Sequence, residues 1–405
     1  MTAGAGRPVI LCLNGGSSSI RFAVYAVGTA LERQLAGKIE RIGLPGTQLV
    51  VTGPAPPGAP PQPIGAADAA QATAFLLDWL KSQPACAALS AISHRLVHGM
   101  SHSLPERVTP ALLGELRAII PYDPDHLPGE IALLEACGRA HPGIPQVACF
   151  DTAFHRTLPP LARLLPIPRR FAAQGVVRYG FHGLSYAYLM QELRRLGDPA
   201  ARRGRVILAH LGNGASLAAV RDGRSVDTTM GFTPAGGLVM STRTGDLDPG
   251  IAGYFARAEQ MSAGQIQHLI NHESGLLGIS ETSSDLRDLE ARAPTDARAA
   301  EALGIFCYQA KKGIGAYAAA LGGLDTLVFA GGIGENSPLA RAQICAELEF
   351  LGLALDPERN GASAPVISPD GSRATVRVIR TNEEAMLAEL AARLLPLGNL
   401  PAPNL

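Results

Sequence analysis

The 405-residue sequence lacks the features that mark several other classes of protein. It contains no apolar run near the ~20 residues that a membrane-spanning helix requires. Its first residues, MTAGAGRPVILCLNGG, hold one arginine and a strand-length apolar run, which differs from a secretory signal. The formal net charge at pH 7 is zero, which indicates neither a nucleic-acid groove nor a polybasic membrane surface. We therefore expect a cytoplasmic protein with no membrane and no nucleic acid among its partners.

Cysteine and lysine are also scarce. The six cysteines are scattered and form no Cys-x-x-Cys pair, so we expect reduced thiols, without a disulfide framework or a cysteine metal site. Only four lysines stand against 31 arginines, a bias that indicates genome composition. Where a motif usually has lysine and this sequence has arginine, we therefore attribute the replacement to genome composition. The positive charge is kept.

The residues that are present predict an α/β protein with a sizeable core. Apolar residues make up 47% of the chain, whose length suits two or three domains of ~150 residues each. Two stretches resemble each other, ILCLNGGSSSIRFAV from Ile10 and ILAHLGNGASLAAV from Ile207. Each has an apolar strand, a Gly/Asn turn, small hydroxyl residues and a second apolar strand. This internal duplication predicts two domains of like topology.

The stretch 227–250, DTTMGFTPAGGLVMSTRTGDLDPG, has no apolar period, which is typical of a functional or a disordered loop, and its apolar residues argue against disorder. Its glycines suit close approach to a ligand, and the planar guanidinium of Arg243 suits phosphate or carboxylate oxygens. The alternative is a structural loop in which Arg243 pairs with Asp246 or Asp248. The residues of the loop alone favour neither interpretation.

Other candidates lie in turns and at strand ends. The turn at Asn14, with serines at 17–19 behind it, predicts a phosphate-binding hairpin tip, although an ordinary Asn-Gly turn is the alternative. Arg95 and Asp151 end apolar strands, where ligand crevices of α/β sheets lie, while a helix N-cap is the alternative for Asp151. His182 lies in a sharp turn between glycines.

The remaining pattern predicts helices and loops around these sites. The Pro-rich segment 53–65 predicts an exposed loop, and helices are expected at 66–81 and 295–321. Ser262 begins a Ser-x-x-Gln capping box. The strand TLVFA is followed by a Gly-rich turn before a helix at Pro338, an arrangement typical of nucleotide sites.

Nine stretches in order make the sequence similar to the acetate kinase family. They cover nearly the whole chain, from residue 9 to residue 385, and are LNGGSSSIRF, HRLVHG, FDTAFH, YGFHG, HLGNGAS, DTTMGFTP with TRTGDLDPG, SSDLRD, GGIGENS and TNEE. The resemblance implies the fold of acetate and sugar kinases, actin and heat-shock chaperones. That fold has two ribonuclease-H-like α/β domains of duplicated topology with an interdomain nucleotide cleft. The N-terminal domain is expected at 1–150, completed by a helix at 385–405, and the nucleotide-binding domain at 151–384.

The resemblance also implies cofactors and roles for charged residues. ATP/ADP and Mg²⁺ are the expected cofactors, with Mn²⁺ as an alternative metal. Asn14 and Glu383 match residues near the metal, and Arg21 a residue near the nucleotide phosphates. The other matches are Arg95 and Arg243 for the acyl carboxylate and the transferring phosphoryl group, Asp151 for an essential acid, His182 for a transition-state stabiliser, and His126 for a further active-site histidine.

Two further groups are implied by the same motifs. Apolar residues match the pocket for the acyl methyl group, namely Val97, Phe181 and Pro234. Three stretches match the ATP-binding segments, namely His210, Leu211, Gly212, Asn213 and Gly214; Asp285, Leu286 and Arg287; and Gly332, Ile333, Gly334, Glu335 and Asn336. A homodimer is expected from the family alone.

The sequence departs from the family pattern at a few positions. Arg21 stands where lysine is usual, Met100 replaces a glycine, Leu184 and Tyr186 replace polar residues, and Leu127 replaces an asparagine. Asp125 stands where a leucine usually lines the acyl pocket. Either Asp125 faces the acyl group, or the nearby prolines turn it toward solvent, and the second alternative is favoured because loops vary more readily than buried charges.

The expected function is reversible transfer of the γ-phosphoryl group of ATP to acetate, which gives acetyl phosphate and ADP. A kinase for propionate or for another short carboxylic acid, with or without a hydroxyl group, is the alternative within the same chemistry. A non-catalytic ATP-driven clamp or filament of the same superfamily is the alternative from a different class. Such a clamp would not need Arg95, Asp151, His182 and Arg243 together.

Overall fold

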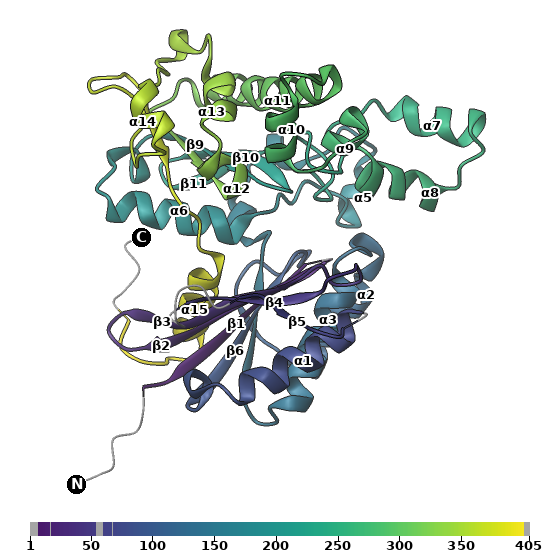
Figure 1. Cartoon of the computed structure of the whole chain (residues 1–405), viewed down its shortest axis with the longest axis vertical. Coiled ribbons are helices and arrows are strands. Elements are labelled where there is room, and N and C mark those ends of the chain that lie inside the picture. Colours follow the sequence, from purple (N-terminus) through teal and green to yellow (C-terminus); the bar gives the residue numbers. More distant parts are fainter. Residues whose placement is uncertain (1–6, 17, 54–59, 67, 401–405) are drawn as a thin grey trace. The chain divides into compact units, whose positions relative to one another are not determined.

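The computed structural model describes residues 7–16, 18–53, 60–66 and 68–400. The chain forms two compact units, the first of Met1–Ala153 with Asn382–Leu405 and the second of Phe154–Thr381. The described residues of each unit contain one β-sheet (Figure 1). Asp151 lies in the first unit, beyond the end predicted for the N-terminal domain at residue 150.

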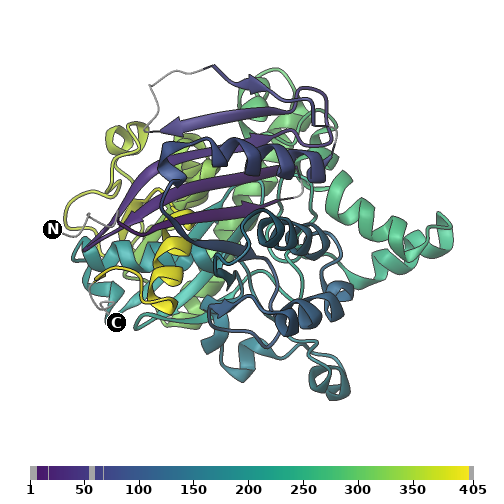
Figure 2. The same cartoon turned by 90° about the horizontal axis from the view of Figure 1, so that it is seen from below.

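The first unit is built on an eight-stranded sheet with the order β5-β4-β3-β2-β1-β6-β8-β7. Its strands are β1 (Val9–Gly15), β2 (Ser19–Val27), β3 (Leu31–Glu40), β4 (Gln48–Gly53), β5 (Gln62–Pro63), β6 (Leu89–Leu96), β7 (Glu106–Arg107) and β8 (Gln146–Phe150). Its helices are α1 (Ala69–Lys81), α2 (Pro110–Ala118), α3 (Leu127–Ala140) and α15 (Glu383–Leu394). Figure 2 shows α1 and α3 beside the purple strands of this sheet, where Leu76 and Leu133 pack into the same apolar core as Leu11.

Helix α15 comes from the far end of the chain and packs on β1, β2 and β6 (yellow beside purple in Figure 1). The hydroxyl of Ser93 in β6 donates to the carbonyl of Leu387 in α15 at 3.0 Å. Because this helix covers the sheet, the residues at its first turn, among them Glu383, are carried to the strands of the first unit.

The second unit has a five-stranded sheet with the order β11-β10-β9-β12-β13. Its strands are β9 (Arg205–Leu211), β10 (Ala215–Arg221), β11 (Arg224–Thr228), β12 (Thr326–Ala330) and β13 (Thr375–Val378). Helix α6 (Gly183–Arg195) packs its Leu189 and Leu193 against Val206 and Val328 of this sheet. The long α11 (Ala297–Leu321) packs on β9 and β10.

Shorter helices complete the described chain. They are α4 (Pro160–Arg163), α5 (Arg169–Ala173), α7 (Pro249–Ala258), α8 (Ala263–His268), α9 (Gly275–Ser280), α10 (Leu286–Arg292), α12 (Gly331–Asn336), α13 (Pro338–Cys345) and α14 (Pro357–Gly361). Single turns lie at Pro84–Cys86, Ile120–Tyr122, Ala153–Thr157, Pro199–Ala201, Leu269–Glu273 and Glu349–Leu351.

The duplication predicted from the two similar stretches is present in the sheets. β1 pairs antiparallel with β2 and parallel with β6, and β6 pairs parallel with β8. In the second unit β9 pairs antiparallel with β10 and parallel with β12, and β12 pairs parallel with β13. The two similar stretches are therefore the equivalent central hairpins, and the predicted α/β class with two duplicated units is confirmed.

Local sequence signals explain most of the element boundaries. The side chain of Asp68 caps α1, and Ser262 and Gln265 form the predicted capping box of α8. Pro63 lies in the short edge strand β5, within the segment predicted to be a loop, and an edge strand tolerates a missing N–H. Residues 54–59 of that segment are outside the described residues.

Two positions differ from a simple reading of their residue types. The Gly-rich stretch after β12 is a short helix, α12, and not the turn that was predicted. Met100 has a φ of 52°, in the left-handed region that glycine adopts freely, which explains why the family pattern has a glycine there.

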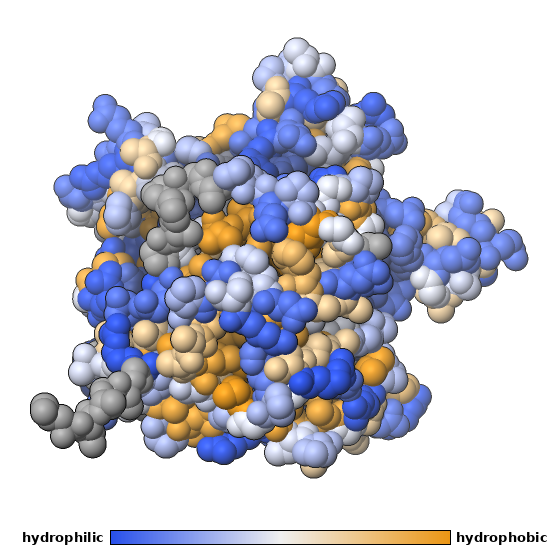
Figure 3. All heavy atoms as spheres, turned by 60° about the horizontal axis from the view of Figure 1, so that its bottom comes forward, coloured by the Kyte–Doolittle hydropathy of each residue, from blue (hydrophilic) through white to orange (hydrophobic). Residues whose placement is uncertain are grey.

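The surface mixes hydrophilic and hydrophobic residues, as the face in Figure 3 shows. Among the described residues, Leu161 and Phe350 are the most exposed large hydrophobic side chains, at 99% and 71%. Single exposed apolar residues are ordinary on folded proteins. No helix in the described part of the chain combines the length and the apolar character that crossing a membrane would require.

Candidate active site

In the first unit, polar residues lie at the ends of the three parallel strands β1, β6 and β8. Nη2 of Arg95 donates to Oδ2 of Asp151 at 2.9 Å, and Nη1 of Arg95 lies 3.5 Å from Oδ1 of Asn14. Nδ2 of Asn14 donates to Oε2 of Glu383, the first residue of α15, at 2.8 Å. The structure thus brings four predicted site residues into one network, which we call the carboxylate network: Asn14, Arg95, Asp151 and Glu383.

The carboxylate network keeps a buried arginine charged. The Asp151 side chain is fully buried and that of Arg95 is 16% exposed. Burial works to lower the pKa of Arg95, but the carboxylates of Asp151, Glu383 and Glu130 outweigh it and raise that pKa above its ordinary value. A cation that is held in this way can bind a further anion without losing its charge.

The same network has a donor set that fits magnesium. It offers carboxylate and amide oxygens, the ligands that Mg²⁺ prefers, and Mg²⁺ usually takes one or two carboxylates together with phosphate and water oxygens. Within the described ranges, no group of three or more His, Cys, Asp or Glu side chains lies close enough to hold a metal ion on its own. The side chains of Asn14 and Glu383 therefore fit a Mg²⁺ ion whose remaining ligands are nucleotide phosphate and water oxygens.

Two buried acids near the carboxylate network were not predicted. Glu130, in the first turn of α3, is 4% exposed, and its two carboxyl oxygens accept from the N–H of Val97 at 3.1 and 3.0 Å. Burial raises the pKa of Glu130 to about 8, against the opposing effects of Arg95 and the Val97 N–H. The signal in the sequence was a single acid on the apolar side of this helix, followed by Ile131.

The second buried acid, Asp123, shares a hydrogen bond with His126. Oδ1 of Asp123 lies 2.8 Å from Nδ1 of His126, which is the N-cap residue of α3. Asp123 is 4% exposed. Asp125, which stands where the family pattern has a leucine that lines the acyl pocket, is an exposed residue. The prediction that the prolines turn Asp125 outward agrees with this exposure.

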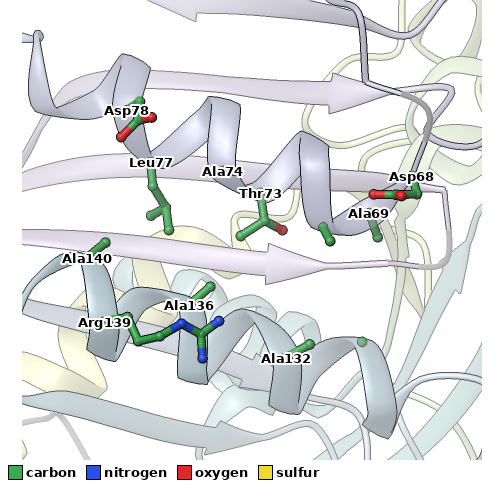
Figure 4. A pocket seen from close by; sticks show the side chains of 12 residues that line it. Asp68, Ala69, Thr73, Ala74, Leu77, Asp78, Ala132, Ala136, Arg139 and Ala140 are labelled. Atoms are coloured by element: carbon green, nitrogen blue, oxygen red, sulfur yellow. The ribbon is translucent and has the colours of Figure 1, made fainter.

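Two hollows lie between α1 and α3. The inner one, about 120 Å³, is lined by the turn at Gly15 and Gly16 and by Thr73, Asp125, His126 and Glu130 among others. The outer one, about 630 Å³, is a groove with Thr73 and Leu77 of α1 facing Ala132, Ala136 and Arg139 of α3 (Figure 4). Val97 lines neither, so Asp125 and Val97 do not share these hollows.

Arg21 lies opposite Asn14 across the β1–β2 hairpin. Its side chain is exposed and lines a shallow hollow with Arg33 and Glu384. Burial raises the pKa of Glu384, and Glu383 raises it further, while Arg21 and Arg95 lower it. Glu383, by contrast, bonds directly to Asn14, so Glu383 is the acid of this pair that joins the carboxylate network.

In the second unit, the side chains of two predicted site residues, a histidine and an arginine, converge on the β9–β10 turn. A Cβ atom added to Gly214 would lie 3.1 Å from Nε2 of His182 and 3.6 Å from Nη1 of Arg243. The ring of His210 stacks on that of His182 with 4.2 Å between the centroids. The structure thus brings together His182, His210, Gly214 and Arg243, which we call the cation cluster.

His182 is held in an unusual conformation. It has a φ of 58° and is the N-cap of α6, and left-handed backbone at a non-glycine residue often marks a functional site. Its Nδ1 lies 2.8 Å from Oγ of Ser216 in β10, and this oxygen is 2.5 Å from the hydroxyl of Tyr186. Nε2 of His155 lies 3.0 Å from the carbonyl of Phe181, the residue before His182.

The loop 227–250 is folded back on itself around Arg243. Nη1 of Arg243 donates to the carbonyl of Pro234 at 3.0 Å. Oδ1 of Asp246 accepts from the N–H of Gly237 at 2.8 Å, and Asp248 caps α7 by accepting from Gly250. The two acids therefore have structural roles within the loop.

The remaining predicted ATP-binding residues lie in three places of the second unit. Asn213 accepts from the N–H of Ser241 at 3.2 Å, which ties the β9–β10 turn to the loop 227–250. Oε1 of Glu335 in α12 accepts from the N–H groups of Gly331 and Thr381 at 3.0 and 3.1 Å. Asp285 caps α10 and forms an exposed ion pair with Arg287 at 2.6 Å.

Leu211, Phe181 and Leu286 are buried and contribute packing at these places. The three apolar residues predicted for the acyl pocket are divided between the units, with Val97 in the first and Phe181 and Pro234 in the second. Sequence reasoning also missed Ser216 and Tyr186, although Tyr186 stands out as a departure from the family pattern four residues after His182.

The chain has two related α/β units, each with polar groups gathered at its central hairpin. This architecture places it in the class of proteins with duplicated ribonuclease-H-like units. A family model described as the Acetokinase family matches residues 9–389. The chain therefore belongs to the acetokinase family.

Individual relatives agree with this membership. An acetate kinase of Rhodopseudomonas palustris is 42% identical over 397 residues, which cover 96% of this chain and 99% of that protein. A propionate kinase of Citrobacter freundii is 42% identical over 392 residues, with 95% and 96% covered. The crystal structure of Porphyromonas gingivalis acetate kinase is similar with a TM-score of 0.85 and 36% identity, and covers 96% of this chain and 100% of that one.

Proposed function

We propose that the protein is an acyl kinase that transfers the γ-phosphoryl group of ATP reversibly to acetate, giving acetyl phosphate and ADP. The observation that supports this most is the convergence of His182 Nε2 and Arg243 Nη1 on Gly214 in a glycine-rich turn. Two cation-forming side chains aimed at a turn without a Cβ leave room for an anionic group and can bond to its oxygens. Membership of the acetokinase family adds the acceptor class.

The acceptor needs little activation. A carboxylic acid with a pKa near ~4–5 is ionised at pH 7, so no strong base is required. The difficulty is to bring this anion in line with the anionic γ-phosphate, and most catalysis of phosphoryl transfer comes from positioning and charge neutralisation. We assign Arg95 to the acceptor carboxylate, and Arg243 and His182 to the transferring phosphoryl group.

The other roles follow from the contacts. Asp151 orients Arg95 through their ion pair at 2.9 Å, and His126 is a further polar group of the acceptor side. Asn14 and Glu383 would hold Mg²⁺, or Mn²⁺ in its place, which when bound neutralises phosphate charge. Arg21, the segment 210–214, the segment 285–287 and the segment 332–336 are assigned to ATP or ADP. Val97, Phe181 and Pro234 are assigned to the acyl methyl group.

Propionate is a second candidate acceptor, because a propionate kinase matches the chain as well as an acetate kinase does, each at 42% identity. Acetate and propionate differ by one methylene, which is worth only about 10–200-fold in discrimination. We further propose that the domain boundaries follow those of the two units, and that the protein is a cytoplasmic homodimer.

A hydroxamate assay tests the proposal. The purified protein is incubated with ATP, Mg²⁺ and acetate, propionate, glycolate or butyrate, and acyl phosphate is trapped as the hydroxamate. We expect product with acetate and with propionate. ATP hydrolysis without hydroxamate for any acid would refute the acyl kinase and favour the ATP-driven clamp. Sedimentation at several protein concentrations tests the homodimer separately.

A further inference from the structure

The hydroxyls of Ser216 and Tyr186 form a chain that ends on the ring of His182. Tyr186 lies one helical turn after His182 in α6, and its N–H donates to the carbonyl of His182 at 3.0 Å. The Tyr186 hydroxyl is 2.5 Å from Oγ of Ser216, which is 2.8 Å from Nδ1 of His182. Tyr186 and Ser216 are both 0% exposed. The chain is therefore screened from water, where directed hydrogen bonds hold a side chain most effectively.

The direction of the donors can be followed along this chain. A tyrosine hydroxyl keeps its proton at neutral pH and donates when it is buried. When Tyr186 donates to Ser216, the one hydrogen of the Ser216 hydroxyl is directed to Nδ1 of His182. The ring nitrogen that accepts a hydrogen bond carries no proton, so the proton of the neutral ring lies on Nε2.

Nε2 is the His182 ring atom that lies nearest to the place where a Cβ of Gly214 would stand, at 3.1 Å. An N–H at this atom donates to a phosphoryl oxygen, whereas a lone pair there would repel it. We propose that Tyr186 and Ser216 are positioning residues that hold the His182 ring in place and keep its proton on Nε2. The role of that N–H rests on the proposed function, in which it donates a hydrogen bond to the transferring phosphoryl group.

The stack of His210 on His182 fits the same arrangement. Nδ1 of His210 lies 2.8 Å from Oγ of Ser185, which is 2.8 Å from Oγ1 of Thr381. Both histidines of the stack thus have Nδ1 next to a serine hydroxyl, one from β10 and one from α6. The two rings are fixed side by side at 21° to one another.

The test is a ¹⁵N spectrum of the side chains of protein labelled at its ten histidines. The two ring nitrogens resonate far apart in a neutral ring, and the protonated one is identified by its attached hydrogen. The spectrum of His182→Gln assigns the His182 signals by their loss. We expect a neutral His182 ring with the hydrogen on Nε2 in the wild type, and a mixture of tautomers in Tyr186→Phe and Ser216→Ala.

Turnover is measured on the same variants. Tyr186→Phe should lower kcat roughly fivefold, as expected for one ordinary hydrogen bond, with the KM for ATP within twofold of wild type. Ser216→Ala should lower kcat further. Ser216→Thr keeps the hydroxyl and should therefore have the kcat and the single tautomer of the wild type. Tyr188→Phe, at a half-buried tyrosine of the same helix, is the control and should change neither.

Two results would overturn the assignment. One is a wild-type ring with its hydrogen on Nδ1 or on both nitrogens, and the other is an unchanged spectrum and an unchanged kcat in Tyr186→Phe and Ser216→Ala. The spectrum does not depend on turnover. If the wild type forms no acyl phosphate from any acid, the proposed function fails, while the spectrum still reports whether the hydroxyl chain controls the ring.

Discussion

The central hairpins of the two units share a topology but differ in the chemistry gathered around them. β1–β2 and β9–β10 each lie next to a parallel strand in the same sheet order. Around the first hairpin the structure places the carboxylate network, with the further buried acids Glu130 and Asp123 nearby. Around the second it places the cation cluster, in which His182 and Arg243 approach Gly214.

This difference shows how one duplicated scaffold can divide a reaction. In the proposed function, the acids and the amide of the carboxylate network serve the metal and Arg95, while the histidine and arginine beside Gly214 serve the phosphoryl group. The sheet supplies the same strand ends in both units, and the side chains at those ends decide the role. The difference between the two hairpins predicts different responses to substitution at individual residues.

The largest effect is expected from Arg243→Ala. Loss of one donor to charge that develops in the transition state typically costs ~10²–10³ in kcat. ATP binding, measured by calorimetry, should persist because the glycine-rich segments are untouched. Arg257→Ala, at an exposed arginine of α7, serves as the matched control. Turnover close to wild type in Arg243→Ala would remove the cation cluster from the reaction.

The two turns can be compared directly by adding one methyl group to each, in Gly214→Ala and in Gly15→Ala. In Gly214→Ala the new Cβ meets His182 Nε2 at 3.1 Å and Arg243 Nη1 at 3.6 Å, whereas in Gly15→Ala it makes ordinary contact with Leu133 at 3.4 Å. We expect kcat to fall roughly tenfold or more in Gly214→Ala, because small displacements of reacting groups are costly. Gly15→Ala should stay within about twofold. Equal losses in the two variants would contradict the asymmetry.

The pH dependence of stability should report the buried acid of the first unit. The folded pKa of Glu130 is about 8, above its value of 4.5 in an unfolded chain, so the folded state binds the extra proton between these two pH values. Stability from this group is complete below the unfolded pKa and is lost as pH rises through about 8. Relative to wild type, Glu130→Gln should therefore gain a few degrees of Tm as pH rises from 5 to 9.

Thermal unfolding of wild type, Glu130→Gln and Glu135→Gln at several pH values measures this effect. Glu135 lies on the same helix but is partly exposed and pairs with Arg117, so its variant is the control. A constant difference in Tm between wild type and Glu130→Gln across the pH range would show that Glu130 is ionised in the folded protein.

The smallest effect is expected at Asp125. Because its side chain is exposed, Asp125→Leu should leave the ratio of kcat/KM for acetate, propionate and glycolate within about twofold of wild type. A marked gain for propionate in the variant would instead place Asp125 beside the acyl group.

The sequence predicted the fold and the residues of the carboxylate network and of the cation cluster. It predicted less of the contacts that these residues make. The duplication followed from two similar stretches, and Asn14, Arg95, Asp151 and Glu383 followed from motif matches. Glu130 was missed because a lone acid in an amphipathic helix usually faces solvent, and only the fold shows that it meets the N–H of Val97.

Other misses have the same cause. The link from Tyr186 through Ser216 to His182 joins α6 to β10, two elements far apart in the sequence, so no local pattern could reveal it. The stretch after β12 looked like a turn because of its glycines, but the carboxylate of Glu335 accepts from Gly331 and helps to close a short helix. For Asp125 the sequence left two alternatives, because three prolines leave the path of its loop open, and the exposed side chain agrees with the favoured one.

The central claim is that the γ-phosphoryl group of ATP passes to a carboxylate under the control of the cation cluster. ³¹P NMR of the protein with ATP, Mg²⁺ and acetate follows this group directly, with Arg243→Ala measured in parallel. We predict an acyl phosphate signal that grows in step with ADP in the wild type and is nearly absent in Arg243→Ala. Formation of inorganic phosphate in place of acyl phosphate, or equal acyl phosphate in both proteins, would contradict the claim.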